Sequence, residues 1–307
     1  MNRASRLARI TLITVVLQIA LGAYTRGSGS GYGCRDRWPL CEGGALGGLL
    51  PRLEFHMIVE WSHRWVASIA VLLVAATAVS VWRHHRDRRE LRAAAVIALV
   101  TILGAAGLGG IVVATNLNAD LVTVHLTAAL ALVALLTYLN VRLRSAPPPP
   151  PDRLWSGALA LGCTAVFSVL LLGSLVHNEY VPGWPLVSSQ VRLGESWIVP
   201  LHLAHRVAAA ATLVLLVALA IAAVRRRRPP FETRMVHAAA TLFVVNIGLG
   251  AAHVFTEVSS PTLVVAHLLA AALVWGCVVA AAAAATASRV PVPDALPRSA
   301  MAPGAAA

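Results

Sequence analysis

Eight long apolar runs are the feature that most restricts how this chain can fold. They cover residues 8–25, 57–82, 93–115, 119–141, 154–177, 197–224, 235–255 and 261–286. Each run is long enough to cross a hydrocarbon core of about 30 Å as a helix. Only 12% of the residues are charged, too few to coat a water-facing surface. Because the runs lack the two-residue alternation of a membrane β-barrel, the sequence predicts an all-α integral membrane protein with eight transmembrane helices.

The arginines indicate how these helices are oriented. Short loops rich in arginine remain in the cytoplasm. The arginines that would share one side are Arg3, Arg6, Arg9, Arg83, Arg86, Arg88, Arg89, Arg92, Arg142, Arg144, Arg153, Arg225, Arg226, Arg227, Arg228 and Arg234. The longer loops on the other side hold Arg26, Arg35, Arg37, Arg52 and Arg192. We therefore expect both termini inside. A net charge of +12 that is spread over loops also argues against a nucleic-acid partner.

The chain divides near its midpoint, at the five prolines Pro147–Pro151, which favour an extended spacer. We expect an N-terminal four-helix bundle over residues 1–146, a cytoplasmic linker at 147–153, a C-terminal four-helix bundle over 154–287 and a disordered tail at 288–307. Both halves begin in the same orientation, which predicts a parallel repeat about an axis along the membrane normal. The first apolar run resembles a signal peptide, but no clear cleavage site follows it, so we expect a retained span.

Four histidines carry the strongest functional signal. His63, His125, His205 and His267 fall one each on the second, fourth, sixth and eighth spans, all roughly 9–12 Å below the predicted outer face. Ionisable groups at this depth are costly and usually functional. The alternatives are interhelical hydrogen bonding and a zinc site, but no clustered thiols or carboxylates accompany the histidines. The pattern favours two bis-histidine haem sites, one in each bundle.

Residues beside these histidines differ between the halves. Glu60 lies one turn before His63 on the same helix face, whereas His202 takes the equivalent place before His205. Glu60 could be a helix-entrance carboxylate paired with Arg64, or an acid/base group beside a haem edge. Arg64 and Arg206 could pair with haem propionates or extend toward the interface. Weaker candidates for a site are the remaining histidines, His56, His84, His85, His177, His237 and His253.

Two cysteines lie in the first outer loop. Cys34 and Cys41 would face an oxidising compartment, where a short disulfide is plausible, although spacing alone also allows a reactive thiol pair. The other two cysteines, Cys163 and Cys277, lie in mid-membrane and are expected to be small apolar fillers.

Several motifs, in order along the chain, resemble those of the heme A synthases. They are residues 22–26, 27–29 and 34–43 of the first outer loop, the Glu-Trp-Ser-His-Arg stretch 60–64, residues 115–125 and residues 253–267. The resemblance covers about residues 8 to 286 and is closest to bacterial, actinobacterial-type members with a cysteine pair in the outer loop. Two departures are Arg26, where the family usually has threonine, and residues 252–255, where a Gln-Tyr-Phe stretch is common.

This resemblance implies a chemistry. Such enzymes oxidise the methyl group at ring position 8 of haem O to the formyl group of haem A by successive hydroxylations. By this resemblance His205 and His267 would bind a haem b cofactor, and His63 and His125 would flank the substrate haem. Glu60 would be required for activity, and Cys34 and Cys41 would form a disulfide.

The resemblance also implies a setting. The protein would lie in a bacterial plasma membrane, next to a haem O synthase and to cytochrome oxidase assembly factors, with an electron donor that the sequence does not identify. The main alternative is a di-haem cytochrome b that only carries electrons. A transporter built on a repeat is a third alternative, but the helices that bear the histidines lack internal prolines near them.

Overall fold

The computed structural model describes residues 3–144, 152–177, 180–187 and 196–286. The helices within these ranges are α1 (Arg3–Gly27), α2 (Ala45–Gly48), α3 (Phe55–His84), α4 (Arg89–Ala114), α5 (Ala119–Arg142), α6 (Arg153–Val176), α7 (Ile198–Arg225), α8 (Pro230–Phe255) and α9 (Pro261–Ala285). All of them except the short α2 are long and apolar enough to cross a membrane. The prediction of an all-α protein with eight membrane-spanning helices is confirmed.

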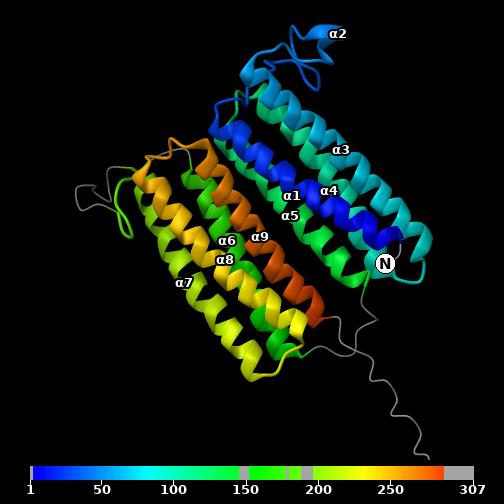
Figure 1. Cartoon of the computed structure of the whole chain (residues 1–307), viewed down its shortest axis with the longest axis vertical. Coiled ribbons are helices and arrows are strands. Elements are labelled where there is room, and N and C mark those ends of the chain that lie inside the picture. The colour runs from blue at the N-terminus through cyan, green and yellow to red at the C-terminus, as the bar shows by residue number, and fades with distance from the viewer. Residues whose placement is uncertain (1–2, 145–151, 178–179, 188–195, 287–307) are drawn as a thin grey trace, which may run out of the picture.

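The long helices pack as two groups of four (Figure 1). In the first group, α1 packs against α3, α3 against α4, α4 against α5, and α5 back against α1. The second group, α6 to α9, packs in the same cyclic order. The groups meet mainly where α9 packs against α1 and α5. A buried hydrogen bond crosses this boundary, from Nε1 of Trp275 on α9 to the carbonyl of Leu130 on α5, at 2.9 Å. The orientation in the membrane stays a prediction.

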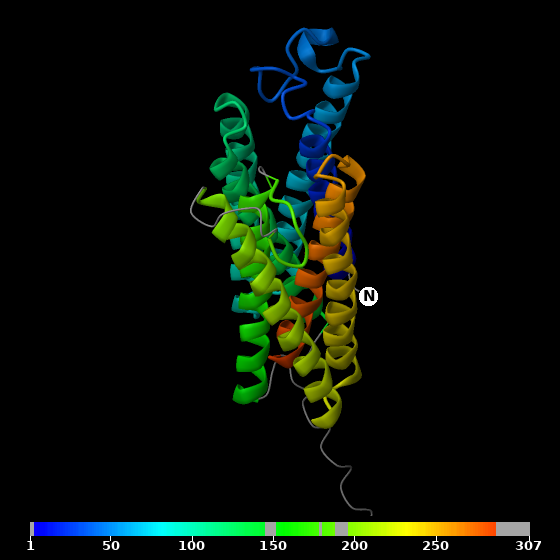
Figure 2. The ribbon, with the colours of Figure 1, turned by 90° about the vertical axis from the view of Figure 1, so that its left-hand side faces the viewer.

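The two ends of the molecule differ in their loops (Figure 2). The loop between α1 and α3, which carries α2, rises beyond the helices at one end. We call this the disulfide end, because Cys34 and Cys41 form a disulfide there. α1 ends at the disulfide end, and α3, α5, α7 and α9 begin there. The opposite end, where α1 begins, is called the arginine end.

Four of the long helices, α1, α3, α4 and α8, begin two to five residues before the predicted apolar runs, and the other four begin within one residue of them. α8 begins at Pro230, five residues before the predicted span, because proline is well tolerated in the first turn of a helix. α6 begins at Arg153, within the segment assigned to the linker, since the side chain of Asp152 accepts a hydrogen bond from the Trp155 N–H and caps the helix. The polyproline segment 147–151 and the tail 288–307 lie outside the described residues.

Candidate haem-binding site

Each of the four predicted histidines packs against a glycine on the preceding long helix. A Cβ atom placed on the glycine would lie 3.0 Å from Cε1 of the histidine at Gly22–His63, 3.5 Å at Gly109–His125, 3.1 Å at Gly173–His205 and 3.2 Å at Gly250–His267. The side chain of even an alanine would therefore press on three of the four imidazole rings. The glycines let the helix backbones approach closely and hold each ring in place between its two helices.

A polar group four residues before each glycine faces the same histidine, since residues at this spacing share a helix face. Nδ1 of His267 lies 3.1 Å from the backbone carbonyl oxygen of Asn246. His125 and His205 are directed at the corresponding carbonyls of Ala105 and Val169, although their Nδ1 atoms have no partner within hydrogen-bond geometry in the described chain.

The fourth histidine has a different partner. The amide nitrogen of Gln18 lies 2.9 Å from Nδ1 of His63 and 2.9 Å from the His63 carbonyl oxygen. The carbonyl can only accept, so this contact identifies the amide nitrogen as a donor. Nδ1 of neutral His63 then accepts, and its ring proton lies on Nε2. At His267, by contrast, the Asn246 carbonyl requires the proton on Nδ1 and leaves the Nε2 lone pair free.

The second histidine pair lines one cavity. His205 and His267 border a space of about 450 Å³ between α6, α7, α8 and α9 at the disulfide end. The walls are mainly apolar, and this size lies in the usual range for cofactor sites. In the first half, His63 and His125 are close enough to interact electrostatically. The structure thus brings together the members of each predicted pair.

Polar residues beyond the two predicted ligands also line this cavity. They are His177, His202 and His253, which ranked below the four histidines in the sequence, together with Arg206, Tyr180 and Arg26. The rings of His253 and His267 meet edge to face with centroids 5.4 Å apart. Arg26 comes from α1, in the other half of the chain. Its position in the sequence does not suggest that it lines a cavity of the second half. Cationic and polar groups in the lining of a mainly apolar cavity suit an amphipathic ligand with acidic substituents.

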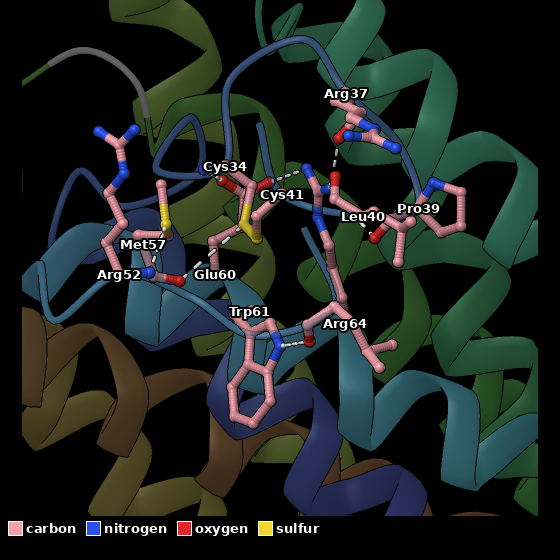
Figure 3. The surroundings of a disulfide bond; sticks show 11 residues. Cys34, Arg37, Pro39, Leu40, Cys41, Arg52, Met57, Glu60, Trp61 and Arg64 are labelled. Carbon is pink, nitrogen blue, oxygen red and sulfur yellow. Dashed lines mark hydrogen bonds and ion pairs between the residues drawn. A yellow bond between two sulfur atoms is a disulfide. The ribbon is translucent and has the colours of Figure 1, made fainter. Parts of the chain in front are cut away.

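Glu60 joins α3 to the disulfide loop (Figure 3). Its side chain is buried and accepts a 2.6 Å hydrogen bond from the backbone N–H of Cys34. It also forms an ion pair with Arg64, one turn further along the helix. The sequence allowed two interpretations of Glu60, and the structure shows one of them, the pairing with Arg64. It also shows a contact with the disulfide loop that the sequence did not indicate.

Arg64 and Arg206 each bind backbone carbonyls of a neighbouring loop. Nη1 of Arg64 donates to the carbonyls of Arg37, Leu40 and Pro39 at 2.7, 3.0 and 3.3 Å. Arg206 donates to the carbonyls of Gly183 and Val181 at 2.5 and 3.0 Å. Both arginines therefore hold down the loop above their own histidine, and Arg206 in addition lines the cavity.

The disulfide loop packs tightly on the start of α3. Cys34 and Cys41 are fully buried and pack with buried Met57 and partly buried Trp61. Trp61 Nε1 donates to the carbonyl of Leu49 at 2.8 Å. Gly33 has no room for a side chain, because a Cβ there would lie 2.2 Å from the carbonyl oxygen of His56. The loop is thus a fixed cover over the disulfide end of the first four-helix group.

The donor set fits haem. A bis-histidine haem is held by two imidazoles, and each half offers one such pair. Zinc would need more ligands close together, and no three His, Cys, Asp or Glu side chains gather in that way within the described ranges. The Nδ1 hydrogen bond of His267 leaves Nε2 available for iron, which is the usual arrangement for a metal-bound histidine.

Comparison with known proteins finds relatives over most of the chain. A family model described as "Cytochrome oxidase assembly protein" (COX15-CtaA) matches residues 49–279. A heme A synthase of Geobacillus kaustophilus is 28% identical over 271 residues, covering 82% of each chain. A heme A synthase of Shouchella clausii is 28% identical over 291 residues, covering 88% of this chain and 93% of the relative. A heme A synthase of Bacillus licheniformis is 36% identical over 143 residues, covering 45% of this chain and 46% of the relative.

The family model spans six of the long helices completely and reaches the seventh, α9, including all four histidines and Glu60. With the eight membrane-spanning helices, this identifies a multi-pass membrane protein of the bacterial plasma membrane. The chain belongs to the COX15-CtaA family of cytochrome oxidase assembly proteins.

Proposed function

We propose that this chain is a heme A synthase, which oxidises the methyl group at ring position 8 of haem O to the formyl group of haem A. The observation that carries the proposal is the unequal setting of two otherwise matched histidine pairs. All four histidines share the glycine contact. Within the described residues, only the first pair lies beneath a disulfide loop tied to a buried carboxylate, and relatives that cover most of the chain are named heme A synthase.

The C-terminal half would hold a resident haem b, with His205 and His267 as axial ligands. Supporting this are the shared cavity of about 450 Å³ and the Nδ1 contact that leaves Nε2 of His267 free. Arg206, Arg26, His177 and His253 would receive the propionates at the cavity mouth. When bound, the haem would supply a redox centre that passes electrons to or from the reaction in the other half.

The N-terminal half would receive haem O between His63 and His125. A substrate must leave after reaction, so a weaker ligand is an advantage there. Because Gln18 donates to Nδ1 of His63, Nε2 carries the ring proton and has to lose it before it can bind iron. The same argument favours stable ligation at His267, where Nε2 is already free. This difference supports the assignment of substrate to the first half and cofactor to the second.

Glu60 would hold a negative charge beside the reacting haem and accept or release protons during the oxidation. Its contacts with Arg64 and Cys34 would keep the carboxylate at a fixed position. The disulfide loop, held by Arg64, would exclude bulk water from that end of the chamber.

The remaining assignments belong to the same proposal. Residues 1–146 would form the substrate unit and 154–287 the cofactor unit, related as a parallel repeat with both termini inside. The recurrence of the glycine contact in all four helix pairs supports the repeat. Haem O synthase and cytochrome oxidase assembly factors would be the partners that deliver haem O and receive haem A.

The test is haem conversion in cells. The chain would be expressed with a haem O synthase in a bacterium that lacks its own heme A synthase, and total membrane haems would be separated by chromatography. The proposal predicts haem A in these cells and its absence without the chain. Unchanged haem O would favour the alternative of a di-haem electron carrier, which the matching glycine contacts of both halves also allow.

A further inference from the structure

A second cavity, of about 1140 Å³, lies toward the arginine end on the boundary between the two four-helix groups. α1 and α8 form its walls, with α5 and α9 between them, and α1 and α9 run side by side in Figure 1. Ile13, Leu17 and Leu273 in its lining are exposed, so the cavity is a groove that opens on the lipid-facing surface. The charged residues of its lining come from the arginine ends of the helices, which leaves the rest of the groove mainly apolar.

Two buried polar side chains of α5 interrupt this apolar lining. Thr137 and Asn140 are three residues apart, so they share a helix face, and they are only 5% and 9% exposed. Nδ2 of Asn140 donates to the carbonyls of Ala8 and Leu136 at 2.9 and 2.8 Å, which fixes the amide and leaves Oδ1 as an acceptor. Within the described residues, neither Oδ1 of Asn140 nor Oγ1 of Thr137 has a hydrogen-bond partner.

This pair of groups matches one hydroxyl of a ligand. A hydroxyl can donate to Oδ1 of Asn140 and at the same time accept from the hydroxyl of Thr137. A carbonyl or ester oxygen only accepts, so it would leave Oδ1 without a donor. Gly276 of α9 also lines the groove, and the nearest atom to a Cβ added there is Oγ1 of Thr137 at 4.0 Å. The glycine therefore leaves room beside the Thr137 hydroxyl.

α9 connects this groove with the cavity that holds His267. Gly276 lies nine residues after His267, about 13.5 Å along the helix axis. Val274 lines the histidine cavity and Gly276 lines the groove, and Trp275 is the residue between them. Its buried indole packs on Phe167 with ring centroids 5.4 Å apart. A ligand in the groove would thus lie close to the proposed haem b site, with an aromatic side chain at the boundary.

We infer that this groove binds an isoprenoid quinol. One ring hydroxyl would donate to Asn140 and accept from Thr137, and the isoprenoid chain would lie along Ile13, Leu17 and Leu273. The quinone form has carbonyls in place of hydroxyls and offers no donor, so the groove favours the reduced form.

Binding of the quinol does not depend on haem, but its use does, and there the inference rests on the proposed function. Oxidation of one quinol to the quinone releases two electrons and two protons. Ferric iron at the site of His205 and His267 would take the electrons one at a time, and water at the arginine end of the groove would take the protons.

Native mass spectrometry of the purified full-length chain in neutral detergent tests the headgroup. Decylubiquinol, kept reduced under nitrogen, should bind about fivefold more tightly than decylubiquinone, which lacks the donor for Asn140. Dioleoylglycerol, which has a hydroxyl but no ring, should also bind more weakly. Equal binding of quinol and quinone would show that the Asn140 acceptor is not used. Equal binding of dioleoylglycerol would show a groove for any lipid hydroxyl, and either result would overturn the inference.

A conservative variant tests the polar pair. Thr137→Val removes the hydroxyl and keeps the shape of the side chain, so it should weaken decylubiquinol binding about fivefold. Thr164→Val is the matched control, because Thr164 is exposed on α6, donates to the Ala160 carbonyl and lines neither cavity. Unchanged binding in Thr137→Val, or an equal loss in the two variants, would contradict the inference.

A second pair of variants tests the space beside Thr137. Gly276→Leu should fill it and abolish decylubiquinol binding while the protein still elutes as a single species. Gly248→Leu should leave binding unchanged, since Gly248 does not line the groove and its added Cβ meets no atom within 4 Å. Unchanged binding in Gly276→Leu would count against the groove.

These binding results separate the inference from the proposed function. Haem A made in cells by a wild-type chain that binds no decylubiquinol would overturn the quinol site and leave the proposed function standing. Decylubiquinol binding without haem A would support the quinol site and contradict the proposed function.

Discussion

The backbone N–H of Cys34 donates a 2.6 Å hydrogen bond to Oε2 of Glu60. Glu60 lies on α3 one turn before His63, so this bond links the disulfide loop directly to the helix that bears the first histidine of the proposed substrate site. Since Arg64 binds both Glu60 and the loop carbonyls, the loop, the carboxylate and the arginine form one connected unit.

Substitution of Glu60 should separate its charge from its structural role. Glu60→Gln keeps an acceptor for the Cys34 N–H but removes the ion pair with Arg64. Glu60→Ala removes both the acceptor and the ion pair. It should lower the free energy of unfolding by about 1–3 kcal/mol, because the buried Cys34 N–H is left without a partner. If the charge is needed for reaction, both variants should lower haem A yield about a hundredfold or more.

Thermal unfolding should show a larger loss of stability in Glu60→Ala than in Glu60→Gln. The haem b absorbance of the purified proteins serves as the control for an intact second half. Haem A at the wild-type level in Glu60→Gln would contradict a role for the carboxylate charge and leave Glu60 as a structural anchor of the loop.

Replacing either proposed axial ligand should remove haem b. His205→Ala and His267→Ala each leave only one of the two proposed ligands in the cavity, and the low-spin bis-histidine spectrum requires both. We expect loss of the haem b Soret band in purified protein. His237→Ala is the control, because His237 is exposed and its Nδ1 lies 2.8 Å from the Thr233 carbonyl of its own helix, away from the cavity lining. A normal Soret band in His267→Ala would refute the ligand assignment.

The glycine contacts give a prediction that does not alter any ligand. In Gly250→Ala the new methyl group would lie 3.2 Å from Cε1 of His267, and we expect a cost of about 1–3 kcal/mol from overpacking together with reduced haem b content. Gly248→Ala on the same helix is the matched control, since its added Cβ meets no atom within 4 Å. The pyridine haemochrome assay measures haem b in both, and equal content would show that the glycine does not position the ring.

The sequence is sufficient to predict the eight spans and the four histidines, because lipid imposes a length and a composition on every crossing helix. It does not reveal which glycine meets which histidine. Apolar length defines a span but not the rotation of the helix about its axis, so Gly250 could not be distinguished from Gly248 before the packing was known. Three of the four preceding spans hold more than one glycine, and three of the four polar groups are backbone carbonyls, so the residue types alone do not identify these contacts.

The loop contacts were not predictable for a different reason. Arg64 and Arg206 bind backbone carbonyls. Every residue has a backbone carbonyl, so the sequence does not indicate which one an arginine will bind. The positive charge of the two arginines suggested haem propionates as partners. Arg26 lines the cavity of His205 and His267 although it comes from the first half of the chain, a long-range contact that no local pattern reports. The low rank given to His177 and His253 followed from their place at helix ends, where a polar ring is not costly.

The disulfide and the membrane orientation can be tested together by thiol labelling of intact cells. Cys34 and Cys41 are bonded to each other, so a membrane-impermeant maleimide should not label them until a reductant is added. After reduction they should be labelled from the outside. Labelling without reductant would disprove the disulfide, and labelling only after permeabilisation would disprove the prediction that the termini lie inside.

The haems bound to the purified wild-type protein test the central claim most directly. The chain would be purified from cells that also make haem O, and its pigments extracted and separated by chromatography. The account predicts haem B, held by His205 and His267, together with haem O and haem A from the site between His63 and His125. Haem B alone, with haem O abundant in the same membranes, would contradict a heme A synthase and identify an electron carrier.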